Sequence, residues 1–511
     1  MKKIVFSFLL VFLMWFLYAC TKETLDPSDL SELENDILMQ IPNQINSDLK
    51  LDIDSSYQVT YELLGQKSEG FFDYVSPFYD QKGTMKITVQ KGDSKIDVEK
   101  EVTLVSLESG LNETKISIDL NVPLNQVNKE DYVLASVKVE TKKNDEIVIE
   151  HQTTEAKLRG RGNSTWYSYE KKPYRLRFDK NTSILGMPAA KNYVLLAEYA
   201  DKSLIRNAIT HKMSSLFTNL DYTIEVRFVE LTINNEYLGV YLLTEQVENH
   251  PNKLNLDSVP GILDTDYLFE LDMRFFEQNV EAGYDWFLDD RHAYQIKDPD
   301  PDELAYTKNH AAYLESYIAE LEDALEQKVG YEAYIDVDNA VDYFLIHEIL
   351  KSVDVGWSSV FMIKHKAGPM TYGPLWDFDF AYGNTNYNNY GDGPEGWYGM
   401  RDGKNRIFEL MMQIPAIRTK FQVRFEMYYN EILPRMAELI PALSDSIKEM
   451  ANRNFKRWPI LKEYVWPNPQ AILELDTHEK QVNFVINFML YRSNWINEHI
   501  DGSSYRYGYF D

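Results

Sequence analysis

The 511-residue chain has a single cysteine, Cys20, so no disulfide can form within it. Stability must come from a buried core, and the length is sufficient for two or three domains. Basic residues are also scarce, since 52 lysines and arginines oppose 80 acidic residues, giving a net charge of −28. This charge argues against a nucleic-acid partner and favours a cationic protein or divalent metal ion, although strong acidity also serves solubility.

Two sets of catalytic motifs are missing. His347-Glu348 begins a zinc-protease pattern, but Lys351 stands where the second histidine ligand is required. No Gly-x-Ser-x-Gly nucleophile turn occurs, and the nine histidines are scattered without metal-ligand spacing. The sequence therefore excludes a zinc protease and a serine hydrolase of these types.

The N-terminus carries one long apolar run, Ile4–Tyr18, which follows two lysines and ends at Ala19. It is too short for a membrane span and predicts an export signal over residues 1–19. The last four residues of this stretch, ending at Cys20, resemble a lipobox, so we expect cleavage and lipidation there. A plain secretory signal with an incidental thiol is the alternative. On the first interpretation, residues 20–36 form a polar tether from the lipid, and the protein is anchored in the cell envelope outside the cytoplasm.

Short alternating segments follow, such as SYQVTYELL and TKISIDLNV, separated by turn residues. They predict a small β-sandwich-like domain over residues 37–125, which we interpret as a spacer. A turn-rich link then leads into a larger domain over residues 130–505. Its elements include strands, a helix after Asp201, a hairpin around Asn234-Asn235 and a helical region from Ile407 to Ile500. The fold class is therefore α+β.

A basic cluster begins the larger domain. Seven basic residues and one acid lie between Lys157 and Arg177. The glycines between Arg159 and Arg161 and after Arg161 allow a turn that brings donors close to an anion. In the next strand Arg175 lies on the same face as Arg177, with apolar residues on the other face. Phosphate or carboxylate is the expected ligand. The alternative is a strand neutralised by the protein's own acids.

A second cluster is acidic. The sequence predicts a buried helix after Asn339, a loop carrying Asp354, a strand, a turn and a returning strand that contains WDFDF. The period of two in a strand would place Asp377 and Asp379 on one face, where a cation such as Mg²⁺ would relieve their repulsion. Asp354 could accept a proton from an attacking hydroxyl. The alternative is a solvated strand face.

With both clusters in view, the chain resembles the spore-coat protein H (CotH) kinase family. The segments that carry the resemblance lie in the family's order: LRGRGNSTW, KKPYRLRF, LGMPAAKNYVLLAEYADKSLIRNAI, FVELTINNEYLGVYLLTEQV and LWDFDFAYG. The resemblance implies an atypical, two-lobed, protein-kinase-like domain with a helical C-terminal lobe. It further implies ATP and Mg²⁺ as cofactors and a serine or threonine hydroxyl of an envelope protein as the acceptor.

The resemblance also assigns residues. Asp354 is the catalytic base, Asp377 the principal metal ligand and Asp379 a second ligand or support. Lys172 is expected to bind phosphate, with Lys157 as the second choice and Glu245 as an ion-pair partner. Arg159, Arg161, Arg175 and Arg206 are carried over as nucleotide-binding positions.

One position departs from the kinase pattern. Ser358 and Ser359 occupy the neighbourhood in which a kinase supplies an asparagine for a second metal ion. A serine hydroxyl is a poorer ligand, so a one-metal enzyme or a pseudokinase stays open. The alternative function is therefore a non-catalytic surface lipoprotein that binds a glycan or a protein.

Overall fold

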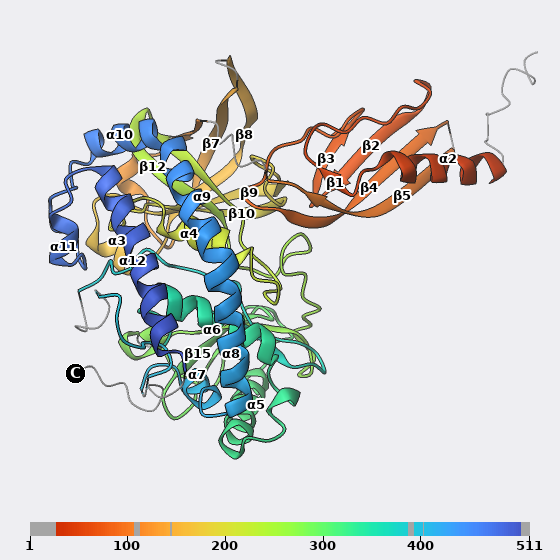
Figure 1. The fold of residues 1–511 in the computed structure, drawn as a ribbon. Helices are drawn as coiled ribbons and strands as arrows, with labels where there is room; N and C mark the ends of the chain where they lie inside the picture. Colours follow the sequence, from red (N-terminus) through yellow and green to blue (C-terminus); the bar gives the residue numbers. More distant parts are fainter. Residues whose placement is uncertain are drawn as a thin grey trace, which may run out of the picture. The chain divides into compact units, whose positions relative to one another are not determined.

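The computed structural model describes residues 27–501, except positions 93, 107–112, 144–145, 279, 387–392 and 402. The expected signal segment and the expected lipidation site, Cys20, lie outside the described residues. The chain divides into two compact units, Met1–Leu107 and Glu108–Asp511 (Figure 1). Among the helices in the described part, none has the length and apolarity needed to cross a membrane.

The N-terminal unit is one sheet with a helix, not the expected sandwich. Its five strands lie in the order β1-β5-β4-β2-β3. Their bounds, with that of the helix, are α2 (Pro27–Gln40), β1 (Gln44–Ile45), β2 (Gln58–Leu63), β3 (Gln66–Glu69), β4 (Gln81–Lys91) and β5 (Ser94–Leu104). The buried face of the sheet carries Tyr61, Met85 and Ile87, and Ile37 from α2 joins this core.

Helix α2 explains the difference. The predicted strands are present, but part of the apolar layer that covers them comes from a segment whose acidic composition predicts a tether over residues 20–36. The described part of that segment is helical, and Leu33 packs partly buried against the core. The end of the unit also differs from the expected residue 125. Strand β6 (Thr114–Leu120) pairs with strands of the second unit, so the division falls near Leu107.

The second unit contains a closed barrel with strand order β10-β12-β11-β6-β7-β8-β9. After β6, the barrel strands are β7 (Val133–Lys143), β8 (Glu146–Gly160), β9 (Tyr174–Thr182), β10 (Ala190–Leu196), β11 (Val226–Ile233) and β12 (Glu236–Glu245). Alternate residues such as Leu158, Leu176 and Tyr241 fill the interior. The turn between β11 and β12 is the expected one, because Asn234 and Asn235 both adopt positive φ.

A second sheet and a set of helices complete this unit. The sheet order is β14-β15-β13-β16-β17, with β13 (Tyr267–Leu271), β14 (Trp286–Leu288), β15 (Ala293–Asp298), β16 (Val360–Lys364) and β17 (Met370–Tyr372). The α-helices are α3 (Ser164–Ser168), α4 (Arg206–Ser214), α5 (Asn309–Gln327), α6 (Val337–Leu350), α7 (Arg406–Met411), α8 (Pro415–Met427), α9 (Leu433–Ser446), α10 (Lys448–Arg457), α11 (Gln470–Leu473) and α12 (His478–His499). Short helical turns are η1 (Leu124–Gln126), η2 (Met273–Glu277), η3 (Tyr331–Ala333) and the π-helical η4 (Tyr428–Ile432). The expected helical C-terminal region is thus present.

Helix α6 is central to this region and packs against α8 and α12. Its N-cap is Asp336, whose side chain accepts from the backbone N–H groups of Asp338 and Asn339. Twelve of its fourteen residues are buried, because neighbours cover it on several sides. It therefore holds the loop that follows, which carries Asp354, in a fixed place.

The returning strand that was expected to run through WDFDF is shorter than predicted. Strand β17 ends at Tyr372, and Asp377 has a φ of 70°, in the left-handed region. The turn residues Gly373-Pro374 stop the ladder, because proline has no N–H to donate. The carboxylates of Asp377 and Asp379 are consequently not placed side by side by strand alternation.

Helix α6 also contains a buried titratable group, His347. Its ring packs on Tyr343 at 4.6 Å and on Phe378 at 5.3 Å between centroids, and neither ring nitrogen has a hydrogen-bond partner in the described residues. Burial lowers the pKa of His347 to about 3. The unfolded chain, with an ordinary histidine pKa of about 6.5, therefore takes up a proton that the folded chain refuses.

His347→Phe is expected to reduce the sensitivity of the fold to acid. Because the folded pKa is depressed, the wild-type imidazole lowers the stability as pH falls from about 6.5 towards 3. The stability lost by this route between pH 7 and pH 5 is about 2 kcal/mol. Urea denaturation of both proteins at the two pH values measures it. An equal loss in variant and wild type would contradict the assignment.

Candidate functional site

A cavity of about 1400 Å³ lies in the second unit, lined by segments from the barrel, the second sheet and the loops after α6 and β17. The residues that sequence reasoning selected fall into two groups. Those that line the cavity are Arg159, Arg161, Arg175, Asp354, Asp377 and Asp379. Three others, Lys172, Arg206 and Glu245, are not among its lining residues.

Barrel strands β8 and β9 supply the cationic wall of the cavity. Arg159 and Arg175 are directly opposite each other in the ladder. Like charges in that arrangement destabilise a sheet, so an anion bound between them would offset a cost already present. The Nε atoms of both side chains are buried without a hydrogen-bond partner, and neither arginine forms an ion pair with any described residue. Neutralisation by the protein's own acids applies instead to Lys157, which pairs with Asp179 at 3.1 Å.

The glycine-bearing loop after β8 brings Arg161 across the cavity. Gly160 lies against the Trp166 ring, and Gly162 has a φ of 82°, so a side chain at either position would clash or strain the turn. The guanidinium group of Arg161 lies 5.5 Å from the ring centroid of Trp376, the residue before Asp377. Burial lowers the pKa of Arg161, while the charge of Asp377 opposes this effect. The loop therefore links the cationic wall to the acidic one.

The acidic wall of the cavity consists of Glu198, Asp377 and Asp379 and is built around the turn at Asp377. Aspartate tolerates the left-handed conformation better than most residues. The backbone N–H of Phe378 donates to Asn207 Oδ1 at 2.6 Å, and Ser359 Oγ donates to Asp377 Oδ2 at 3.3 Å. Helix α4 and the loop before β16 thus fix this turn from two sides.

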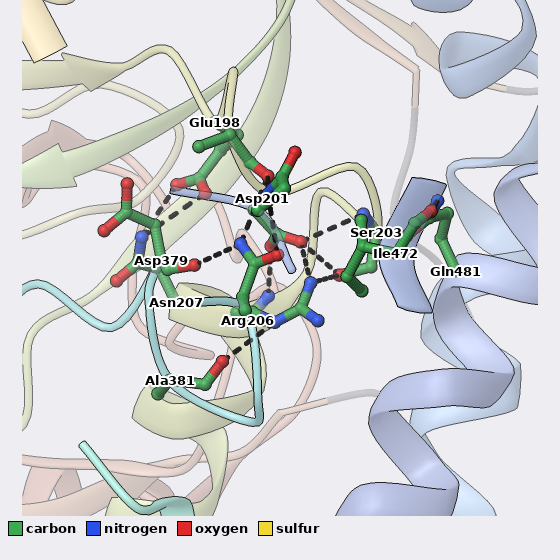
Figure 2. A network of polar contacts seen from close by, with 12 residues as sticks. Glu198, Asp201, Ser203, Arg206, Asn207, Asp379, Ala381, Ile472 and Gln481 are labelled. Atoms are coloured by element: carbon green, nitrogen blue, oxygen red, sulfur yellow. Dashed lines mark hydrogen bonds and ion pairs between the residues drawn. The ribbon is translucent and has the colours of Figure 1, made fainter. Parts of the chain in front are cut away.

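Glu198 is a third acid at this wall. Its two carboxylate oxygens accept from Asn207 Nδ2 at 3.0 and 3.3 Å (Figure 2). Burial, with the charge of Asp201 next, raises the pKa of Glu198 to about 8. Burial also raises the pKa of Asp379 well above its usual range, and Asp377 and Glu198 contribute to the rise. The raised pKa values of Glu198 and Asp379 indicate that these two carboxylates have too little positive charge near them.

Such oxygen donors fit Mg²⁺, which prefers carboxylates together with water and phosphate oxygens. In the described ranges, however, no three acids, histidines or cysteines are already arranged as a metal cluster. Sites of this kind usually complete the coordination of Mg²⁺ with substrate phosphates rather than with protein ligands alone. The donor chemistry therefore suits a metal that arrives with a polyphosphate.

Asp354 lies in the loop that follows α6 and lines the same cavity. Within the described part of the chain its carboxylate accepts no hydrogen bond. Burial, together with the charge of Asp377, raises the pKa of Asp354 to about 7, and Arg274 acts in the opposite sense. A carboxylate that titrates near neutrality is suited to general-base catalysis.

Arg206 has a structural place rather than a place in the cavity. It is completely buried and forms an ion pair with Asp201, which also accepts the Arg206 backbone N–H at 2.8 Å (Figure 2). Its Nε donates to the Ala381 carbonyl oxygen at 3.1 Å. Arg206 therefore ties the start of α4 to the segment that carries the acidic turn. The structure thus places this arginine in a buried ion pair and not among the residues that line the cavity.

Lys172 and Glu245 also differ from expectation. Lys172 Nζ donates to the Trp166 carbonyl oxygen at 2.5 Å, so its ammonium group is directed towards α3. Glu245 is buried and accepts from the Tyr222 hydroxyl at 2.6 Å and the Glu225 backbone N–H at 2.7 Å. It makes no ion pair with Lys157, whose partner is Asp179. The Lys172 assignment assumed that this residue begins the arginine-bearing strand, but β9 begins at Tyr174.

Sequence reasoning missed several residues that line the cavity. They are Lys129, Glu198, Asn207, Glu270, Arg274, Lys297 and Lys404. Glu198 and Asn207 stand in the segment AEYADKSLIRNAI, where an acid between apolar residues was a signal that went unused. Glu270 lies in β13 and Lys297 in β15, while Arg274 lies in η2. Lys129 and Lys404 lie in loops, so only the fold brings these five residues together.

Comparison with protein-family models supports this grouping. Residues 158–496 match the family described as CotH kinase protein, and this range is more than half of the chain. A search of curated proteins gives no match. The matched range contains the cationic wall, the acidic turn and the Asp354 loop. The chain therefore belongs to the CotH kinase protein family.

Proposed function

We propose that this protein is an atypical kinase-like phosphotransferase that moves a phosphoryl group from ATP to a serine or threonine hydroxyl of a protein. On this proposal, the barrel and the helical region act as the two lobes of a kinase-like domain. Family membership supports a kinase-like function in general. The observation that carries the finer proposal is the cavity itself, in which unpaired arginines and under-neutralised carboxylates line one space.

Each wall has a role in this proposal. Arg159, Arg161 and Arg175 bind the phosphate oxygens, since planar guanidinium groups match them well. Asp377 and Asp379, supported by Glu198, hold Mg²⁺, which when bound neutralises charge on the phosphates. Asp354 orients the acceptor hydroxyl and takes its proton.

The proposed location is the cell envelope, with a lipid on Cys20 as the anchor and an envelope protein as the substrate. The support is the N-terminal sequence alone, in which an apolar run ends at Ala19-Cys20. Cys20→Ser is the direct test. It is expected to abolish incorporation of radiolabelled fatty acid and to release the protein from the membrane fraction.

ATP with Mg²⁺ is expected to raise the melting temperature of the protein, and Asp377→Ala is expected to abolish most of that rise. A ligand present at a hundred times its dissociation constant stabilises the folded state by about 2.7 kcal/mol. Differential scanning fluorimetry with ATP, Mg²⁺ and both together measures the effect. The matched control is Asp476→Ala, which removes a carboxylate paired with Lys480 on an exposed helix end.

A second candidate is a pseudokinase that binds nucleotide without transferring phosphate. One observation favours it: the Ser359 hydroxyl donates to Asp377 Oδ2 at 3.3 Å, so one oxygen of the proposed metal ligand already has a hydrogen-bond partner. A melting shift with ATP but no incorporation of labelled phosphate into any acceptor would support this candidate. No shift with ATP in the wild type would overturn both.

A further inference from the structure

Arg274 brings a cation to the cavity from beside the second sheet, whereas the arginines assigned to phosphate above come from the barrel. It lies in η2, shortly after β13, and lines the cavity. Its Nε and Nη2 donate to the two carboxylate oxygens of Asp272, each at 2.6 Å, and Nη2 lies 3.4 Å from Glu270 Oε1. Two parallel hydrogen bonds of this kind fix the plane of the guanidinium group.

One nitrogen of Arg274 is not used by this pair. Nη1 has no hydrogen-bond partner in the described part of the chain, yet it is not among the buried polar atoms that lack one, so it is accessible to solvent. The Asp272 side chain is only 4% exposed, whereas that of Arg274 is 24% exposed. A guanidinium group held from behind by a buried carboxylate, with one nitrogen open, is preorganised to bind an anion in the cavity.

The backbone attaches Arg274 to the loop that carries Asp354. The N–H of Met273, the residue before Arg274, donates to the Trp357 carbonyl oxygen at 2.7 Å. The Trp357 N–H in turn donates to the Asp354 carbonyl oxygen at 2.9 Å. Arg274 is therefore held close to the loop of the proposed base by main-chain contacts, which do not depend on the conformation of a long side chain.

Glu270 connects the same arginine to the turn at Asp377. Its Oε1, which Arg274 Nη2 approaches, also accepts from the Ser359 N–H at 3.1 Å. The Ser359 hydroxyl donates to Asp377 Oδ2 at 3.3 Å. Arg274 thus belongs to one hydrogen-bonded network with the proposed metal ligand.

Charges on both sides of the cavity act together with that of Arg274. Burial lowers the pKa of Arg161, on the barrel side, and the positive charges of Arg175 and Arg274 add to this effect. Burial raises the pKa of Asp354 to about 7, whereas the charge of Arg274 opposes the rise. Arg274 is therefore within electrostatic reach of the cationic wall and of the proposed base. An anion between Arg161 and Arg274 would be attracted by both.

We propose that Arg274 binds the γ-phosphoryl group of ATP, the group that is transferred, while the arginines of the barrel hold the rest of the polyphosphate. The inference rests on the proposed function and assigns a further catalytic residue to the same site. The γ-phosphorus must lie next to the hydroxyl that Asp354 orients, and Arg274 is a cation attached to that loop.

The role of Arg274 in the transfer follows from this position. The acceptor oxygen forms a bond to the γ-phosphorus, and the bond from that phosphorus to the β–γ bridging oxygen breaks. ADP leaves with the electron pair, and the hydroxyl proton goes to Asp354. Arg274 Nη1 donates to an oxygen of the γ-phosphoryl group, which carries negative charge throughout the step.

Nucleotide affinities test this contact without relying on catalysis. ADP lacks the γ-phosphoryl group, whereas β,γ-imido-ATP carries one that it does not transfer. Isothermal titration calorimetry of the full-length protein with Mg²⁺ is expected to show about tenfold tighter binding of the imido-ATP. In Arg274→Lys the ammonium group stays with Asp272, so both nucleotides should bind with the affinity of the wild type for ADP. Arg274→Lys should also lower kcat for phosphate incorporation by about 10²–10³-fold.

Arg424 provides a closely matched control. Its Nε and Nη2 donate to the two oxygens of Asp342, each at 2.6 Å, and its side chain is 20% exposed, but it is not among the residues that line the cavity. Arg424→Lys should therefore disturb the fold to a similar extent and keep the tenfold preference for imido-ATP. If Arg274→Lys does not fold, the double variant Asp272→Asn with Arg274→Met removes the whole pair and is expected to give the same loss of preference.

The possible outcomes separate the roles of Arg274. A preserved preference for imido-ATP in the Arg274 variant would overturn the proposal. An equal loss of affinity for both nucleotides would do so too, because it would assign Arg274 to the other phosphates. A wild type that shows the ATP-dependent melting shift but binds ADP and imido-ATP equally well would also overturn it. Failure of the proposed function is distinguishable, because it appears as a missing melting shift with ATP in the wild type.

Discussion

Asp354→Asn is expected to reduce incorporation of labelled phosphate into an acceptor by about 10²–10⁴-fold, the usual contribution of a general base. Asparagine keeps the size and polarity of the side chain but cannot take a proton. Burial raises the pKa of Asp354 to about 7, so the wild-type group is suited to that transfer near neutral pH. Incorporation from radiolabelled ATP, measured at several ATP concentrations, gives the effect on kcat and KM separately.

The same variant should bind nucleotide almost normally, since the proposed phosphate ligands are the arginines of β8, β9 and their loop. The ATP-dependent melting shift of Asp354→Asn is therefore expected to match that of the wild type. Asp476→Asn, on an exposed carboxylate, serves as the control and should keep full activity. Unchanged incorporation in Asp354→Asn would remove the catalytic role assigned to Asp354.

Arg206→Met is expected to lower the free energy of unfolding by about 3–5 kcal/mol, because it leaves Asp201 buried and charged without its partner. Both side chains are fully buried, and Arg206 also holds the Ala381 carbonyl oxygen. Urea denaturation measures the loss. Replacing both partners, as in Asp201→Asn with Arg206→Met, should restore part of the stability because no uncompensated charge remains.

A surface arginine provides the matched control for this measurement. Arg453 makes two hydrogen bonds to Glu230, at 2.8 and 3.0 Å, but its side chain is 42% exposed. Arg453→Met should therefore cost less than about 1 kcal/mol. If Arg206→Met instead kept its stability and lost the ATP-dependent melting shift, the nucleotide-binding role expected from the sequence would be correct and the structural role wrong.

The sequence was most informative where the signal was local. The two asparagines of the β11–β12 hairpin, the alternation in β9 and the glycine-bearing loop around Arg161 each depend on neighbouring residues, and each led to the structure that is present. The acids Asp354, Asp377 and Asp379 were placed near one another from an order of elements. They do line one cavity, although a turn at Asp377, not a strand face, brings them there.

The sequence was least informative where distant segments meet. Arg206 is a conspicuous cation, yet nothing near it in the chain shows that its Nε donates to the carbonyl oxygen of Ala381, 175 residues further on. Lys404 follows a glycine-rich loop without periodicity, and only the fold brings it to the cavity that Asp354 also lines. Helix α2 shows the same limit, because its apolar stripe is short and its acidic residues dominate the composition.

Closure of the barrel affects the rate at which the protein binds a polyanion. Strand β9, which carries Arg175, is hydrogen-bonded to β8 on one side and β10 on the other, so its backbone cannot shift without breaking a ladder. The backbone positions of the opposed Arg159 and Arg175 are thus fixed before any ligand arrives, and binding does not have to order this part of the chain. Charge attraction then governs the association rate, which should fall as ionic strength rises.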